Sequence, residues 1–137
     1  GKSIDGYLDL LIQNNIKALC DVRKNPFSRK YGFSKRQLES CLKSIGITYF
    51  GFPSLGIESN ERRELGNFDD YQRLFDRYEA NTLLKQKDAL NDLIEVYRNH
   101  SRVAFTCFEA DHRWCHRSRV AKALENHPGY HQPVVHL

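Results

Sequence analysis

The sequence predicts an α/β fold in which helices cover both faces of a mostly parallel sheet. Three short apolar runs, at 16–22, 47–52 and 103–106, fit strands that are buried on both faces. Segments with a helical spacing of apolar residues lie between these runs. Because a helical crossover returns the chain to the same end of the sheet, this alternation makes neighbouring strands parallel. The expected architecture is a Rossmann-like three-layer sandwich, formed as a single domain by residues 1–137.

The first helix is expected to begin after Ser3, a side chain suited to capping a helix N-terminus. A polar break at 13–15 ends it, and the strand at 16–22 follows. Asp21 and Arg23 place an acid and a base at the carboxyl end of that strand. The apolar residues that define this helix are Ile4, Tyr7, Leu8 and Leu11.

The second helix is expected to begin at Ser34 with a capping box. In this motif the Ser34 hydroxyl accepts a hydrogen bond from the Gln37 amide, and the Gln37 side chain reaches back to the Ser34 amide. Phe33 can then pack on Leu38 as a hydrophobic staple. Gly46 supplies the left-handed conformation that ends the helix, and the second strand follows directly.

Two further helices are expected after a polar, glycine-punctuated loop, with Asn81 and Thr82 as the break between them. We expect these two helices to pack against each other as a pair. Another helix follows the strand at 103–106, and 133–137 is expected to form a last strand. The apolar residues that define the three helices are Tyr71, Leu74, Phe75 and Tyr78, then Leu90, Leu93, Ile94 and Tyr97, then Val120, Ala121 and Leu124.

The loop after the strand at 103–106 is densely ionisable. The carboxyl ends of parallel strands share one edge of the sheet, and ligands of open α/β sheets bind beyond that edge. This loop and the end of the first strand are therefore expected to form one composite site, with Arg23, Glu109 and Arg117 converging in one cleft. The ionisable residues of the loop are Cys107, Glu109, Asp111, His112, Arg113, Cys115, His116 and Arg117.

The composition indicates a soluble, cytoplasmic protein with no membrane partner. No apolar run approaches the roughly 20 residues of a membrane-spanning helix. The four cysteines are widely spaced and no secretory segment is present, so reduced thiols are expected. A net charge of +4 is only mildly basic, and the class of partner therefore depends on where the charge gathers.

Two motifs carry a family resemblance. The first is Asp-Val-Arg with a following proline (Asp21, Val22, Arg23 and Pro26), and the second is Cys-x-Glu with Cys-His-Arg (Cys107, Glu109, Cys115, His116 and Arg117). With the segments 21–35, 42–50 and 106–124, the chain resembles the bacterial and archaeal family called domain of unknown function 488. The resemblance covers nearly the whole chain and implies a fold and a site, but no reaction. It also implies that a first strand is missing before Gly1.

The start of the last helix is a candidate anion site, because the first amides of a helix have no internal partners and lie at the positive end of its dipole. The segment 21–36 carries six basic residues against one acid, with three aromatic residues among them. That mixture suits a nucleic acid or a nucleotide, and a solvated basic loop is the alternative. The predicted ligand-binding residues are Arg23, Pro26, Arg29, Lys30, Cys107, Arg117 and Ser118.

A reactive thiol at Cys115 is a second candidate feature, because a helix N-terminus and neighbouring cations lower the pKa of a thiol. A buried, inert cysteine beside Trp114 is the alternative. No metal or other cofactor is expected, since the spacing of Cys107, His112, Cys115 and His116 fits no familiar zinc motif. The predicted catalytic residues are Asp21, Glu109, Cys115 and His116.

Two classes of function remain open. One is an enzyme, a hydrolase or transferase, that acts on a nucleotide or nucleic acid, and the other is a module that binds the same ligands without turnover. The carboxylates distinguish them: Asp21 and Glu109 weaken the binding of an anion unless they transfer protons or orient Arg23 and Arg117. In both cases the expected partner is a phosphate-bearing small molecule or a nucleic acid, and the oligomeric state is left open.

Overall fold

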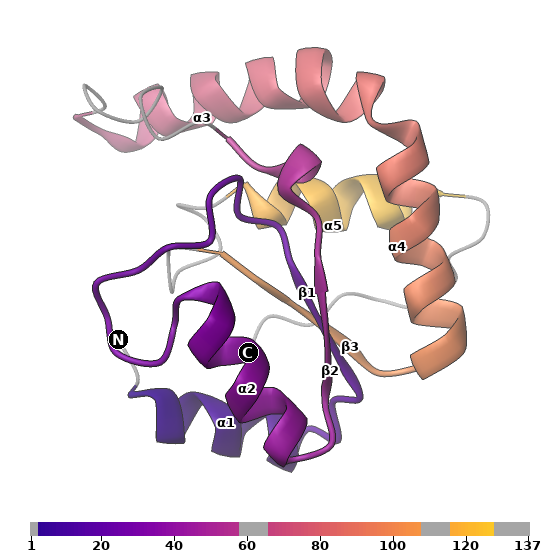
Figure 1. Cartoon of the computed structure of the whole chain (residues 1–137). Helices are drawn as coiled ribbons and strands as arrows, with labels where there is room; N and C mark the ends of the chain where they lie inside the picture. The colour runs from indigo at the N-terminus through magenta and orange to yellow at the C-terminus, as the bar shows by residue number, and fades with distance from the viewer. Residues whose placement is uncertain (1–2, 58–65, 108–115, 128–137) are drawn as a thin grey trace.

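The computed structural model describes residues 3–57, 66–107 and 116–127. These residues contain a sheet of three strands: β1 (Ala18–Asp21), β2 (Thr48–Gly51) and β3 (Val103–Thr106). The order of strands is β2-β1-β3, and both outer strands run parallel to β1 (Figure 1). The parallel sheet is as predicted, although each of the first two strands is shorter than its apolar run.

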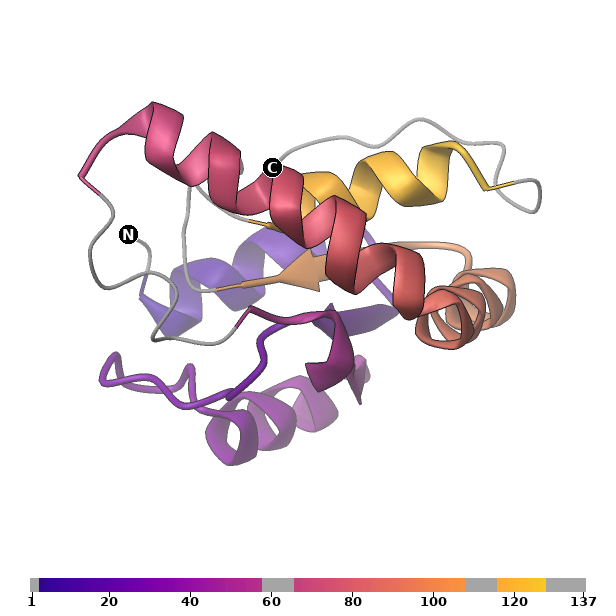
Figure 2. The ribbon, with the colours of Figure 1, turned by 90° about the horizontal axis from the view of Figure 1, so that it is seen from above.

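In the described ranges five α-helices cover the two faces of this sheet, which confirms the three-layer prediction. Leu19 in β1 packs with residues of α1 and α2, whereas Ala18 and Cys20 belong to the cluster that holds the apolar faces of α3, α4 and α5. Figure 2 shows α3 and α5 on one side of the strands and α2 on the other. The helices are α1 (Ile4–Gln13), α2 (Lys35–Ser44), α3 (Phe68–Arg77), α4 (Lys87–His100) and α5 (Arg117–Glu125).

The starts of the first two helices differ in how their serines are used. The Ser3 side chain accepts a hydrogen bond from the Gly6 amide (3.2 Å), as a capping residue should. The capping box predicted at Ser34 is wrong, because the Ser34 hydroxyl does not cap α2. It instead contacts both the amide (2.9 Å) and the carbonyl (3.0 Å) of Ser28, and thus holds the preceding loop. The stop at Gly46 is as predicted, with a φ of 77°.

The prediction that the third and fourth helices pack as a pair is wrong. A π-helical turn (Tyr78–Thr82) and a 3-10 turn (Leu83–Lys85) join α3 and α4 end to end, with a sharp change of direction between them (Figure 1). Both helices bury their apolar sides in one core cluster, to which Phe75 of α3 and Leu93 of α4 belong. None of the helices in the described ranges is long and apolar enough to cross a membrane. The strand predicted at 133–137 lies outside the described residues.

Arg119 links α5 to α3 and to the π-helical turn that follows α3. Its guanidinium donates to Asp76 Oδ1 (2.7 Å), Glu79 Oε1 (3.0 Å) and Gln72 Oε1 (2.8 Å), and it lies 5.8 Å from the centre of the Phe75 ring. Several partners share one largely buried cation, which distinguishes this network from an isolated surface ion pair.

We expect Arg119→Ala to lower the free energy of unfolding by about 1–3 kcal/mol, because hydrogen bonds to a charged group are worth that much and the packing on Phe75 is lost as well. Arg73→Ala is the matched control. Arg73 is exposed and its contact with Asp70 spans 3.5 Å, so its loss should cost less than about 1 kcal/mol. Urea unfolding of both variants measures the difference, and equal losses would show that the network adds nothing to α5.

Candidate functional site

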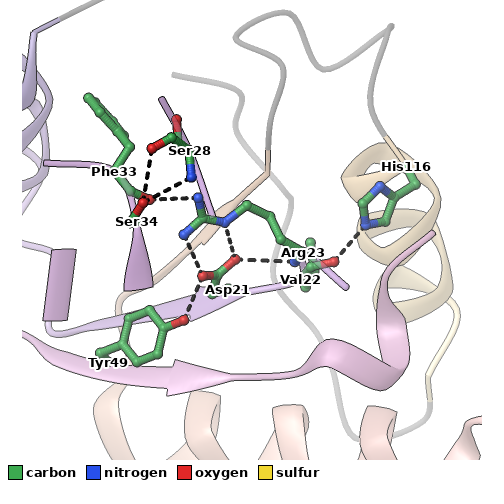
Figure 3. Close-up of polar contacts among 8 residues, drawn as sticks. All are labelled: Asp21, Val22, Arg23, Ser28, Phe33, Ser34, Tyr49 and His116. Carbon is green, nitrogen blue, oxygen red and sulfur yellow. Dashed lines mark hydrogen bonds and ion pairs between the residues drawn. The ribbon is translucent and has the colours of Figure 1, made fainter. Parts of the chain in front are cut away.

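The carboxyl end of β1 carries a buried ion pair between Asp21 and Arg23. Arg23 Nε donates to Asp21 Oδ1 (2.8 Å) and Arg23 Nη2 donates to Asp21 Oδ2 (2.7 Å), while the Tyr49 hydroxyl donates to Oδ2 (2.6 Å) (Figure 3). Only 1% of Asp21 and 3% of Arg23 is exposed. The Arg23 amide adds a further bond to Oδ1 (3.1 Å). The carboxylate is therefore committed to orienting Arg23, which is the role that sequence reasoning set against proton transfer.

Arg23 also forms a hydrogen bond with the loop that follows β1. Its Nη1 donates to the carbonyl oxygen of Phe33 (2.6 Å), so one guanidinium links the end of β1 to the start of α2. Burial lowers the pKa of Arg23, but the hydrogen bond and the negative charge of Asp21 outweigh it and leave the pKa raised. Arg23 thus keeps its positive charge at neutral and alkaline pH.

Two tyrosines at the same strand end were not identified from the sequence. Burial, followed by the hydrogen bond to Asp21, raises the pKa of Tyr49. Burial also raises the pKa of Tyr7, against the opposing effects of a hydrogen bond with Thr106 and the positive charge of Arg117. These effects place Thr106 and Arg117 close to Tyr7, so α1, β3 and α5 all contribute to the end of β1. Both phenols stay protonated well above neutral pH.

His116 joins the start of α5 to the end of β1. Its Nε2 lies 2.7 Å from the carbonyl oxygen of Val22, which only accepts, so Nε2 carries the proton (Figure 3). Its Nδ1 lies 3.5 Å from Cys107 Sγ, and the edge of its ring packs on Tyr78 with centroids 5.3 Å apart. The ring is fully buried and its Nε2 is bonded to the backbone. This geometry favours a structural role for His116, and its catalytic role stays a prediction.

The cysteines divide into two groups. Cys20 and Cys41 are free thiols, as expected, and burial raises the pKa of Cys20 to about 12. Cys107 is disulfide-bonded, which contradicts the expectation of reduced thiols at that position and leaves its sulfur without a titratable proton. Cys107 packs against the core cluster that holds the apolar faces of α3, α4 and α5, beside His116.

A groove of about 510 Å³ is formed by the loop after β1 and the first turn of α2. We call it the basic groove. Its lining carries four cations and no acid, and the side chains of Arg29, Lys35 and Arg36 form no hydrogen bond or ion pair with any other residue in the described ranges. The Lys30 ammonium lies 4.9 Å from the centre of the Phe33 ring. The lining residues are Pro26, Phe27, Ser28, Arg29, Lys30, Tyr31, Ser34, Lys35, Arg36 and Gln37.

The predicted ligand-binding residues therefore fall into two places. Pro26, Arg29 and Lys30 line the basic groove, and Arg23 lies beneath the same loop. Cys107, Arg117 and Ser118 belong to the end of β3 and the start of α5. None of these three residues lines the basic groove, and the composite cleft of Arg23, Glu109 and Arg117 stays a prediction, because Glu109 lies outside the described residues.

Two predicted catalytic residues, Glu109 and Cys115, lie outside the described residues, as does His112. Among the residues that the structure does describe, no group of three or more histidine, cysteine or acidic side chains is arranged to hold a metal ion. The absence of a metal in the protein stays a prediction, because several of the residues that could supply ligands are not described.

Comparison with known proteins gives one match. The family model "Domain of unknown function DUF488" matches residues 3–124, which is most of the chain. No curated protein and no solved structure matches this chain. The match supports the family resemblance carried by the motifs around Asp21 and His116, and its description assigns no reaction.

Proposed function

Because the chain belongs to the DUF488 family, whose description assigns no activity, we propose its function from the site itself: the protein binds a phosphate-bearing ligand of the nucleotide or nucleic-acid class in the basic groove. The observation that carries the proposal is the lining of the groove, where four cations gather without an acid. Since no described residue pairs with Arg29, Lys35 or Arg36, their charge is available to an anion from solution.

The use of the Asp21 carboxylate supports binding rather than chemistry. A free carboxylate beside a phosphate site would repel the ligand. Asp21 is buried and neutralised by Arg23, and Arg23 in turn supports the loop through the Phe33 carbonyl. The acid thus strengthens the support of the groove without adding negative charge to its lining. This is the arrangement that a binding module needs.

An enzyme that acts on the same ligand is the second candidate, and the cluster around Tyr7 favours it. Tyr7, Tyr49 and Arg117 gather near the carboxyl end of β1, where ligands of open α/β sheets bind. A phenol that remains protonated can donate to a phosphoryl oxygen or to a leaving group. The predicted acid or base Glu109, which lies outside the described residues, would serve such a hydrolase or transferase.

Removing two groove cations tests the proposal. We expect the double variant Arg29→Ala/Lys35→Ala to bind a fluorescein-labelled oligothymidine or labelled ATP more weakly than the parent protein. For the oligothymidine, each lost phosphate contact should reduce the slope of log affinity against log salt by about 0.7, so the two together reduce it by about 1.4. Fluorescence anisotropy over a range of KCl concentrations measures both the affinity and the slope.

Lys85→Ala/Lys87→Ala is the matched control, because it removes the same net charge from exposed positions near the start of α4, which packs on the other face of the sheet. This control should bind like the parent. Equal losses in the two double variants would mean that only net charge matters, and no binding of either probe by the parent protein would overturn the proposal. Release of phosphate or nucleotide products in the same samples would favour the enzyme.

A further inference from the structure

The loop between β1 and α2 carries three aromatic residues, and these have different environments. Phe33 packs in the core cluster of α1 and α2, with its ring centre 5.4 Å from that of Tyr7. Phe27 and Tyr31 line the basic groove and are 66% and 79% exposed. An aromatic ring usually gains free energy by burial, so two exposed rings in one groove of a loop that already buries a third require an explanation.

The exposure of these rings is held in place by the backbone around them. The Ser34 hydroxyl is bonded to both the amide and the carbonyl of Ser28, and the Lys35 amide donates to the Pro26 carbonyl (2.9 Å). On the other side, the Gly32 amide donates to Gln37 Oε1 (3.0 Å). The loop is therefore fastened on both sides of Phe27 and Tyr31.

Gly32 fixes the second of these attachments. Its φ is +88°, a conformation that L side chains rarely adopt, and a Cβ at this position would lie 2.6 Å from the Cβ of Ile4 in α1. Tyr31 therefore directly precedes a turn that packs against Ile4 of α1, and its ring lines the basic groove. A ligand would meet a surface whose ordering cost has largely been met during folding.

From this arrangement we infer that the ligand of the basic groove is a single-stranded nucleic acid, with Phe27 and Tyr31 stacking on unpaired bases while Arg29, Lys30, Lys35 and Arg36 contact its phosphates. The inference rests on the proposed function. A groove that combines four cations with two exposed aromatic rings offers partners for both the phosphates and the flat base faces of a single strand. In a duplex the base faces are already stacked on one another, and an inorganic polyphosphate offers no face at all.

The test compares probes and removes the rings separately from the charges. We expect the protein to bind a labelled oligothymidine more tightly than the same strand paired with oligoadenosine, and to be displaced from it less effectively by polyphosphate or ATP than by unlabelled oligothymidine. Phe27→Ala and Tyr31→Ala should each weaken binding of the single strand by about fivefold to a hundredfold. Neither should change the slope of affinity against salt, because no charge is lost.

Two controls keep the outcome clear. Tyr31→Phe retains the ring and should bind like the parent, and Phe68→Ala removes an exposed ring on α3, outside the groove, and should also bind like the parent. Equal affinity for duplex, polyphosphate or anionic vesicles, or unchanged binding by Phe27→Ala and Tyr31→Ala, would overturn the inference. If Arg29→Ala/Lys35→Ala still weakens binding in that case, the phosphate site stands and only the single-strand assignment fails.

Discussion

Replacement of Arg23 by alanine is expected to lower the free energy of unfolding by about 3–5 kcal/mol, because it leaves a carboxylate buried without its counter-charge. Asp21 is 1% exposed and keeps only its bonds to the Tyr49 hydroxyl and to the backbone amide at position 23. The Phe33 carbonyl loses its donor as well. Urea unfolding at neutral pH, followed by circular dichroism, measures the loss.

The control is Arg98→Ala, since Arg98 and Glu95 form an ion pair of similar length (2.6 Å) that is exposed on α4. Its loss should cost less than about 1 kcal/mol. The double variant Asp21→Asn/Arg23→Ala should be less destabilised than the sum of the two single variants, because it no longer buries an unpaired charge. Additive effects would show that the two residues do not stabilise each other.

The second large effect is a loss of stability in alkaline solution. Burial raises the pKa of the Cys20 thiol from 9.0 to about 12, and burial also raises the pKa values of Tyr7 and Tyr49. A group whose pKa is raised on folding stabilises the protein fully below its unfolded pKa, and this contribution is lost as the pH rises towards the folded pKa. For Cys20 alone the loss from pH 9 to pH 12 is roughly 3 kcal/mol, because the full slope of about 1.4 kcal/mol per pH unit holds only between the unfolded and folded pKa values.

Chemical denaturation at a series of pH values measures this slope. Cys20→Ala should start from a lower stability, because it shortens a fully buried side chain. It should lose less on going from pH 9 to pH 10, because a thiol with an ordinary pKa of 9.0 titrates ahead of tyrosines with an ordinary pKa of 10.0. Cys41→Ala, which removes a partly exposed thiol, is the matched control for the loss of a cysteine. The same slope in Cys20→Ala as in the parent would exclude Cys20 as its source.

Local sequence patterns predicted what depends on neighbours along the chain. The apolar runs and helical spacing located the strands and helices, since burial on one or both faces leaves a direct periodic trace. Ser34 shows the limit of such reasoning. Its position before α2 is that of a capping residue, but the folded loop brings the backbone of Ser28 within reach, and the hydroxyl bonds there instead.

The candidate site was predictable in charge but not in geometry. Six basic residues against one acid at 21–36 predicted a strongly positive segment. That Tyr49 meets Asp21 follows from the register of β2 beside β1, which no pattern within a single strand encodes. Phe27 and Phe33 are likewise the same residue type in different environments, because only Phe33 packs against the core cluster that contains residues of α1 and α2.

The positive φ and close packing of Gly32 make this position intolerant of substitution, unlike the positions just before it in the loop. Substitution at Gly32 strains the backbone and displaces α1, whereas the side chains of Arg29, Lys30 and Tyr31 are exposed and do not belong to the core clusters. New ligand preferences can therefore arise by exchange of these tip residues without altering the scaffold. A few mutations at these positions can thus change the ligand preference proposed for the groove while leaving the stability of the fold nearly unchanged.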